Sequence, residues 1–341
     1  MNALQRFAGR YLRRSSNTLI LAYHRITDLK LDPQLLCVSP HRFQEHLEVI
    51  KRDYEAARLN TLDPLLAGGG SSPRRLILTF DDGYADNLTE AVPLLEALDV
   101  PATIFVVTGV VGAKRFFYWD VLAQVFLAKQ GLPDHLSLSV SGKDHLWHIE
   151  PGIGNELASL TTWTILSDAD PLKRCAAYKQ IVGLLKDQAP RLRSELLEYV
   201  LRWADMSPAE MRPQYDTLSE SDLGQLGRHP LIEIGSHTVS HPTMALLSRA
   251  EQMREIINSK QLLEEMIGHP VSSFSYPYGT KRDFTGVTAR LARQAGFQVA
   301  CANFEATIDR NTDRYILPRF LVRNWDGDEF QRRLAAWFER Y

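Results

Sequence analysis

The chain has 341 residues, of which 45% are hydrophobic and 23% are charged, a globular composition with enough chain for a large core. Its formal net charge of -2 excludes the general basic field typical of nucleic-acid-binding proteins. The cysteines Cys37, Cys175 and Cys301 are scattered and odd in number, which argues against a disulfide framework and suits a reducing compartment. The length fits two domains, or one α/β barrel with an insertion.

The segment 1–17 is basic and amphipathic, with four arginines among apolar residues between residues 4 and 14. This pattern fits a solvated first helix or, alternatively, contact with an anionic membrane surface. The apolar run that follows is too short for a signal-peptide core, and no stretch reaches the roughly 20 apolar residues of a membrane span. We therefore expect a cytoplasmic protein, with peripheral contact at the inner membrane face as the alternative.

Short apolar runs followed by turn residues predict buried strands at residues 18–24, 76–80, 102–107, 232–236, 273–276, 298–301 and 315–322. Helical patterns lie between several of them, at residues 40–52, 85–98, 250–267 and 285–294. Strands that alternate with helices favour a parallel sheet. The predicted fold class is therefore α/β, a distorted (β/α) barrel of about seven parallel strands.

A long interruption at residues 114–227 is more helical and irregular than the rest. It contains a predicted hairpin at 136–149 and one or two amphipathic helices at 176–204. We interpret it as an insertion that covers one end of the barrel. The expected organisation is a basic segment at 1–17, a first barrel portion at 18–113, the insertion at 114–227, and a second barrel portion with a C-terminal helix at 228–341.

Two adjacent carboxylates, Asp81 and Asp82, follow the predicted strand 76–80. Neighbouring residues that leave a strand point in different directions, so one can bind a metal while the other faces an attacking water. Gly83 would permit the tight turn. By itself this trio is also ordinary turn chemistry.

Two histidines, His237 and His241, follow the predicted strand 232–236 at a spacing of i and i+4. In a helical turn this spacing places both imidazoles on one face, an arrangement that supports zinc in other sites. The alternative is a pair of polar histidines on an exposed loop. Together with the two aspartates, the histidines indicate metal-assisted hydrolysis.

Other polar residues also end predicted strands. His24 ends the strand 18–24, and Tyr278 follows the strand 273–276. Barrel enzymes place their catalytic groups at the carboxyl ends of strands. Four strands that deliver polar groups to one end predict a site there.

Three motifs carry a family resemblance: TFDDGY at residues 79–84, SHTVSHP at 236–242 and SYPYG at 275–279. With them the chain resembles the polysaccharide deacetylases of the NodB-homology, carbohydrate esterase family 4 type, over roughly residues 15–113 and 228–325. The resemblance implies a distorted barrel, a divalent metal and removal of N-acetyl groups from amino sugars. It also implies that Asp82, His237 and His241 bind the metal and that Asp81 is the general base.

The chain departs from the common family pattern in two places. Ser275 stands where members often carry an arginine that orients the catalytic aspartate, and we expect Arg319 to supply that guanidinium instead. No histidine follows His269, so the usual late histidine motif is absent. A branch that acts on exopolysaccharide amino sugars uses an early Tyr-His motif, which Tyr23 and His24 match. His24 is therefore the expected general acid, in its protonated form; the alternative is a histidine that only caps the strand end.

Several residues are expected to contact the substrate. A backbone N–H at Tyr84 or Tyr278 is a candidate donor to the oxyanion, and Pro277 and Gly279 belong to the same third motif. Trp119 could stack on a sugar ring and Asp120 could bind a hydroxyl. The alternative for the aromatic run 116–119 is that it packs the insertion onto the barrel.

We expect an N-deacetylase for an amino sugar in a glycan, a sugar nucleotide or a lipid-linked precursor, without a nucleic-acid partner. The expected cofactor is a divalent metal, Zn²⁺ before Co²⁺, Ni²⁺ or Mn²⁺. A sugar N-deformylase needs only a smaller acyl pocket and is a close alternative. Hydrolysis of a small non-sugar amide, or a non-catalytic glycan-binding relic, are further alternatives.

Overall fold

The computed structural model describes residues 17–62, 73–112, 115–150, 152, 157–309 and 311–340. The basic segment expected at 1–17 therefore lies outside the described residues except for its last one. Among the described residues, no helix combines the length and the apolar character that a membrane crossing requires.

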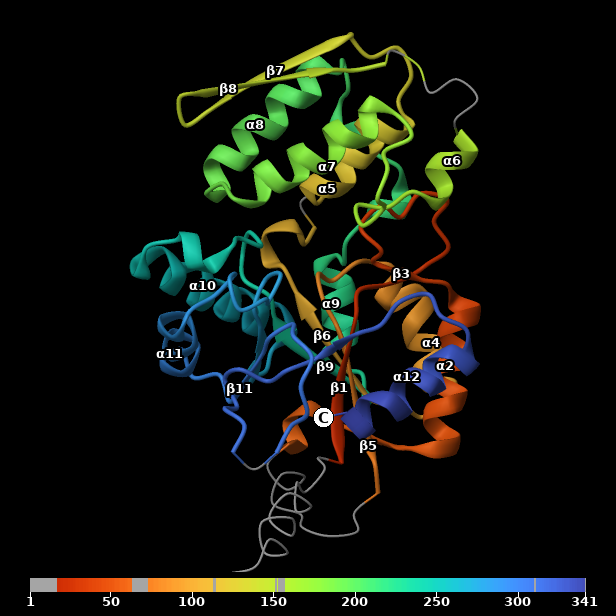
Figure 1. Cartoon of the computed structure of the whole chain (residues 1–341). Coiled ribbons are helices and arrows are strands. Elements are labelled where there is room, and N and C mark those ends of the chain that lie inside the picture. Colours follow the sequence, from red (N-terminus) through yellow and green to blue (C-terminus); the bar gives the residue numbers. More distant parts are fainter. Residues whose placement is uncertain are drawn as a thin grey trace, which may run out of the picture.

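A parallel sheet forms the centre of the fold (Figure 1). Its strands follow the order β11-β10-β9-β6-β5-β1-β12, with β4 paired to the start of β5. Strands β11 and β12 are the two ends of this order. A parallel bridge between Cys301 of β11 and Leu317, which precedes β12, brings the two ends towards each other. The prediction of an α/β barrel with about seven parallel strands is confirmed. The strands are β1 (Thr18–Tyr23), β4 (Glu55–Ala57), β5 (Arg75–Phe80), β6 (Ala102–Val106), β9 (Ile232–Ser236), β10 (Ser273–Ser275), β11 (Val299–Cys301) and β12 (Phe320–Leu321), besides the small pair β2 (Arg25–Ile26) and β3 (Cys37–Val38).

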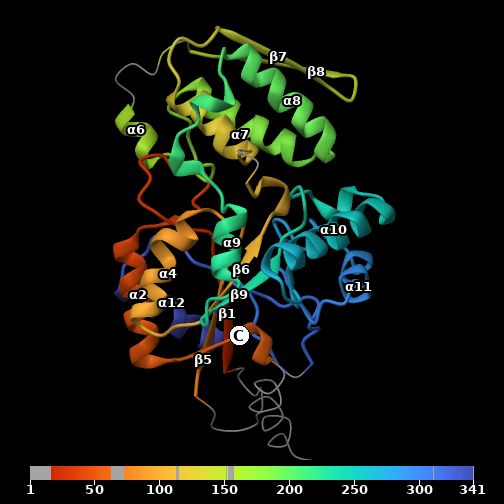
Figure 2. The same ribbon diagram turned by 180° about the vertical axis from the view of Figure 1, so that it is seen from behind.

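Helices cover the outside of this sheet on both flanks (Figures 1 and 2). Most begin at a residue that the sequence marks: Ser248 and Glu251 form a capping box on α10, and Gly268 ends it with a φ of 76°. The expected helix at 85–98 instead starts with a π-turn, η2. The barrel helices are α2 (Pro40–Asp53), η2 (Asn87–Ala91), α4 (Val92–Ala97), α9 (Glu220–Leu226), α10 (Arg249–Ile267), α11 (Gly286–Gln294) and α12 (Gly327–Arg340), with short 3₁₀ turns η1 (Leu59–Thr61), η3 (Thr108–Val110) and η7 (Met244–Leu246).

The strands are buried on both faces, which explains their nearly continuous apolar sequences. All six residues of β1 are buried. Leu19 and Leu21 belong to the core between sheet and helices, whereas Ile20 lies in a smaller cluster with Ile77 and Phe105. Alternate side chains of one strand thus supply two cores.

The insertion forms a separate layer above the carboxyl ends of the strands (Figure 1). It has its own core, which Trp163, Tyr178 and Leu196 share with the hairpin residue Trp147. The hairpin and the helices expected here are present. The elements are α5 (Tyr118–Ala123), η4 (Gln124–Ala128), β7 (His135–Val140), β8 (Lys143–His148), α6 (Leu157–Thr162), α7 (Lys173–Lys186), α8 (Pro190–Trp203), η5 (Pro208–Glu210) and η6 (Pro213–Tyr215).

The end of the insertion differs from the expected residue 227. Leu218, Leu223 and Leu226 pack in the barrel core, and α9 contacts α10 and β9. Helix α9 is therefore a barrel element, because its apolar face is buried against the sheet and not within the insertion. We use "insertion" below for the elements α5 to η6.

Candidate metal centre

The register of the parallel strands places the predicted site residues next to one another at the carboxyl ends of the strands. Tyr23 pairs with Phe80, so that His24 and Asp81 leave β1 and β5 side by side. Further along, Val106 pairs with Ser236, and Ser236 pairs with Phe274. His237 therefore emerges beside the same end, as the placement of catalytic groups in barrels predicts.

Three buried side chains, Asp82, His237 and His241, meet at this end. Asp82 Oδ1 lies 3.6 Å from His237 Nε2 and 3.4 Å from His241 Nε2. One ligand atom from each residue lies within 4.8 Å of the others. One carboxylate and two imidazoles are the donors that zinc and similar divalent metals accept. The three residues that the family resemblance implied as ligands are thus brought together.

The unpaired atoms of this cluster test whether a cation fits. Asp82 Oδ1 and His241 Nδ1 are buried and have no hydrogen-bond partner among the described residues. His237 Nδ1 lies 2.8 Å from the carbonyl oxygen of Ser275, so the proton sits on Nδ1 and the lone pair of Nε2 faces Asp82. A carbonyl behind a histidine is the usual support of a metal-bound imidazole. An orphan carboxylate oxygen facing imidazole lone pairs fits a divalent cation.

Burial also shapes the charges of the cluster. It raises the pKa of Asp82 well above its ordinary value, and the neighbouring Asp81 carboxylate raises it further. It lowers the pKa of His237 and of His241, and the pKa of His241 falls further because a second positive charge beside His237 would be repelled. The imidazoles are therefore uncharged, the form that binds metals. A bound cation would be the positively charged partner that the Asp82 carboxylate needs in order to ionise in this buried position.

The backbone at the site is strained. Asp82, His241 and Tyr278 have φ values of 77°, 51° and 60°, in the left-handed region that costs a residue with a Cβ roughly 1–2 kcal/mol. Such conformations gather at functional sites, where the surrounding structure imposes them.

Asp81 has a different environment from its neighbour. Arg319 Nη1 donates to its Oδ1 at 2.8 Å and Nη2 donates to its Oδ2 at 2.6 Å. Ser275 Oγ lies 2.9 Å from Arg319 Nη2 and 3.4 Å from Asp81 Oδ2. Burial opposes ionisation of Asp81, but the charge and hydrogen bonds of Arg319, together with the neighbouring His237 and His24, outweigh it and hold the pKa well below its ordinary value. The arginine expected from the last strand is present, and Ser275 is small enough to admit it.

His24 lies beside this pair at the end of β1. Its carbonyl oxygen accepts a hydrogen bond of 2.8 Å from Asn87 Nδ2, and its side chain is partly exposed. Burial lowers the pKa of His24 to about 4, against the opposing charge of Asp81. At neutral pH the imidazole is uncharged in the free protein, in contrast to the protonated form expected from the sequence.

Tyr84, Trp119 and Asp120 form a buried contact between barrel and insertion. The Tyr84 hydroxyl donates to Asp120 Oδ2 at 2.7 Å and accepts from Trp119 Nε1 at 2.9 Å. The Arg25 guanidinium lies 4.1 Å from the centre of the Tyr84 ring. The aromatic run therefore packs the insertion onto the barrel, the alternative stated above. Both side chains are buried in this contact, and the expected contacts of Trp119 and Asp120 with a sugar stay predictions.

The third motif lies beside His241. The rings of His241 and Tyr278 are 4.6 Å apart, and the Tyr278 hydroxyl lies 3.1 Å from that of Tyr118 in the insertion. Gly279 has a φ of 67°, and a Cβ there would lie 2.8 Å from the backbone nitrogen of Asn303. Pro277 accepts a hydrogen bond from Gly279 N, which closes the turn that presents Tyr278.

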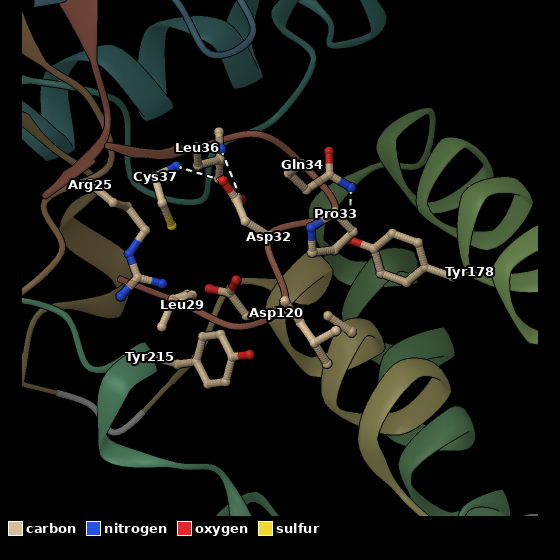
Figure 3. A pocket seen from close by; sticks show the side chains of 12 residues that line it. Arg25, Leu29, Asp32, Pro33, Gln34, Leu36, Cys37, Asp120, Tyr178 and Tyr215 are labelled. Carbon is tan, nitrogen blue, oxygen red and sulfur yellow. Dashed lines mark hydrogen bonds between the residues drawn. The ribbon is translucent and has the colours of Figure 1, made fainter. Parts of the chain in front are cut away.

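A pocket lies next to this contact, between the insertion and the loop after β2 (Figure 3). Asp120, Arg25 and Tyr215 line one side, and Asp32 lies opposite, with its carboxylate accepting hydrogen bonds from the N–H groups of Leu36 and Cys37. Burial raises the Asp120 pKa to about 7. Sequence reasoning missed this pocket, because its charged residues come from segments without a shared motif.

Arg193 was also not expected from the sequence. It extends from α8 of the insertion to the loop that carries His241, and it donates to the carbonyl oxygens of Ser240 and His241. On the barrel side, the Glu255 carboxylate accepts the N–H groups of Val239 and Ser240, each at 2.9 Å. An arginine on an amphipathic helix carries no sequence signal that distinguishes it from a solvated one.

Comparison with known proteins shows relatives that are similar to this chain in sequence or in fold. The family model described as "Polysaccharide deacetylase" matches residues 68–134 and 202–300, which include both ends of the insertion but not its middle. YxkH of Bacillus subtilis (strain 168), which is named for the same family, is 28% identical over 105 residues. That match covers 31% of this chain and 36% of the relative, about a third of its length.

Solved structures share the fold at low sequence identity. IcaB from Ammonifex degensii is 16% identical with a TM-score of 0.56, over 94% of this chain and 97% of that one. A de-N-acetylase from Aggregatibacter actinomycetemcomitans is 15% identical with a TM-score of 0.54, over 93% and 98%. The Streptococcus pyogenes deacetylase PplD, solved in complex with acetate, is 16% identical with a TM-score of 0.51, over 92% and 96%. With its motifs gathered at the carboxyl ends of a parallel barrel, the chain matches the polysaccharide deacetylase family in sequence motifs and in fold.

Proposed function

We propose that this protein is a metal-dependent hydrolase that removes the N-acetyl group from an amino sugar in a glycan or glycan precursor. One observation carries the proposal: a buried cluster of Asp82, His237 and His241, with an unpaired carboxylate oxygen, stands beside a second carboxylate, Asp81, that is held ionised by Arg319. Two adjacent aspartates with opposite environments match the separate tasks of metal ligand and base.

Asp82, His237 and His241 would hold the metal. A divalent metal at this position would polarise the acetamide carbonyl and make an attacking water more acidic. Zn²⁺ is our first choice because the donor set is two imidazoles and a carboxylate.

Asp81 would accept the proton of the attacking water. Its Oδ1 accepts one hydrogen bond from Arg319 and keeps acceptor capacity, whereas Oδ2 is shared between Arg319 and Ser275. Arg319 thus orients the carboxylate and maintains its charge. Tyr84 and Thr217 face each other in an antiparallel bridge. The hydrogen bonds of this bridge join the residues on either side, from Ala85 N to the Asp216 carbonyl and from Leu218 N to the Gly83 carbonyl. The Tyr84 N–H is therefore directed away from Thr217, and we propose it as a donor to the oxyanion.

His24 would deliver a proton to the departing amine. Its place at the end of β1, beside Asp81, and its partly exposed side chain support this role. Because its pKa is lowered to about 4, the imidazole must gain the proton during the reaction and does not hold it beforehand.

The test is a hydrolysis assay on N-acetyl and N-formyl amino sugars, each presented free, nucleotide-linked and lipid-linked. We expect metal-dependent release of acetate, with kcat/KM lower by about 10²–10⁴-fold in Asp81→Asn at unchanged metal content. His237→Ala should lose the metal as well. Formate release alone would favour the deformylase alternative. Deacetylation by Asp81→Asn at the wild-type rate would refute the assignment of the base.

A further inference from the structure

The loop 238–241 carries the metal ligand His241 and is strained at both ends. Thr238 and His241 have φ values of 68° and 51°. The His241 N–H donates to Thr238 Oγ1 at 3.1 Å, which closes the loop on itself. A left-handed residue with a Cβ persists only where its surroundings stabilise it.

The barrel holds this loop by its N–H groups. Glu255 on α10 places Oε2 2.9 Å from both Val239 N and Ser240 N, and its Oε1 accepts the Ser240 hydroxyl at 2.7 Å. These are charge-assisted bonds of the stronger kind.

The insertion holds the same loop by its carbonyl groups. Arg193 Nη1 donates to the His241 carbonyl oxygen at 2.9 Å, and Nη2 donates to that of Ser240. The Arg193 side chain is buried, with 8% of the residue exposed, and its guanidinium also lies 5.2 Å from the centre of the Tyr118 ring. Two parallel donors of a planar fork fix the orientation of two successive peptide groups, which a single ammonium cannot do.

This clamp acts on the direction of the His241 side chain. The orientation of the 240 and 241 peptides determines where His241 Nε2 lies, and that atom is 3.4 Å from Asp82 Oδ1. The insertion adds Trp119, whose ring is 5.1 Å from that of His241. Without Arg193, both carbonyls would lose their partners and the His241 end of the loop would lose its hydrogen bonds to the insertion. The other end stays held from the barrel, because the N–H groups of Thr108 and Gly109 donate to the carbonyl oxygens of Thr238 and Val239.

We propose that Arg193 is a positioning residue of the metal centre, through which the insertion sets the metal affinity of the barrel site. The inference rests on the proposed function, because it takes Asp82, His237 and His241 as metal ligands. It assigns the insertion a part in the metal site beyond that of a cover over the barrel end.

The experiment compares the wild-type chain with Arg193→Gln and Arg193→Lys. Arg191→Gln is the matched control, because it makes the same change on the same helix at a side chain that is 92% exposed. The dissociation constant for Zn²⁺ is measured on metal-free protein by competition with a chromogenic chelator, and the melting temperature is measured on the same samples. The zinc concentration that gives half-maximal activity provides a second measurement.

We expect zinc to bind about 10–100-fold more weakly to Arg193→Gln, the usual effect of losing a group that supports a metal ligand. Arg193→Lys should fall between Arg193→Gln and the wild type, and Arg191→Gln should match the wild type. At saturating zinc, the kcat of Arg193→Lys should return towards the wild-type value, because the reacting groups are intact.

Three results would overturn the inference, and they can be told apart. If the wild type binds no zinc, the proposed metal site fails and the inference fails with it. If the wild type binds zinc and Arg193→Gln binds it within twofold, only the inference fails. Should Arg193→Gln not fold, Arg193→Lys decides the matter: wild-type zinc affinity with a lower melting temperature would show that Arg193 only attaches the insertion.

Discussion

Replacement of Arg319 by methionine tests the arrangement of the base most directly. Arg319 is 1% exposed, and its guanidinium contacts Asp81 through both Nη atoms. It also donates to Thr79 Oγ1 at 3.0 Å and to the Ala302 carbonyl oxygen at 2.9 Å. Methionine removes the charge and all these donors but fills similar space. The buried Asp81 carboxylate then stands without its cation.

Breaking a buried ion pair by removing one partner costs about 3–5 kcal/mol, mainly because the other charge is left unpaired. The double variant Asp81→Asn/Arg319→Met should recover much of this loss, since it removes both charges. Urea denaturation in the presence of a chelator measures the unfolding free energy without a contribution from metal binding.

The pH dependence gives the sharper test. In the wild type, the folded-state pKa of Asp81 is below its ordinary value of 3.8, so its contribution to stability is present above that pH and is lost as the pH falls below it. Without Arg319, burial raises the pKa of Asp81. The stability of the variant should then fall as pH rises from about 4 to 7, and the gap to the wild type should widen. A loss below about 1 kcal/mol, or one that does not change between pH 4.5 and 7, would refute the reasoning.

Three further predictions concern other parts of the site. His24→Ala should lower kcat/KM by about 10²–10⁴-fold while zinc affinity stays at the wild-type value; a parallel loss of zinc would indicate a ligand instead of a proton donor. The Asp120 pKa is raised from 3.8 to about 7, so wild-type stability should fall as pH rises from about 4 to 7, and Asp120→Asn should become more stable relative to the wild type over this window; urea denaturation at pH 4.5 and 7.5 measures this, and an unchanged difference would contradict it. Gly279→Ala should destabilise the protein more than Gly268→Ala. Both positions are left-handed, which costs a residue with a Cβ about 1–2 kcal/mol. A Cβ at Gly279 would also lie 2.8 Å from the Asn303 backbone nitrogen, whereas a Cβ at Gly268 would have no atom within 4 Å. Equal losses in melting temperature would show that this contact relaxes.

Much of the barrel could be predicted from local patterns. The strand expected at 232–236 has these bounds in the structure, and the strand at 18–24 ends one residue earlier. Buried parallel strands are short apolar runs because both faces are covered, and this signal does not depend on distant residues. The expected end of the insertion at 227 came too late, because α9 has a helical pattern like that of the insertion, and only packing shows which core it joins.

The sequence alone identified the residues that meet in the candidate metal centre. Asp81, Asp82, His237 and His241 were predicted because each follows a strand of a parallel sheet, and parallel strands carry such residues to one end. The choice of Arg319 as the partner of Asp81 also came from the sequence, through the serine at position 275, and the structure shows the contact.

Only the tertiary structure decided how the long insertion takes part. Trp119 and Asp120, which the sequence offered as sugar contacts, form hydrogen bonds with Tyr84 that no local pattern indicated. Arg193 carried no signal, yet it reaches the carbonyls of the loop that holds His241. The physical reason is that motifs record what a residue does near its own strand, whereas these contacts join segments about 35 to 50 residues apart, which only the packing of two cores brings together.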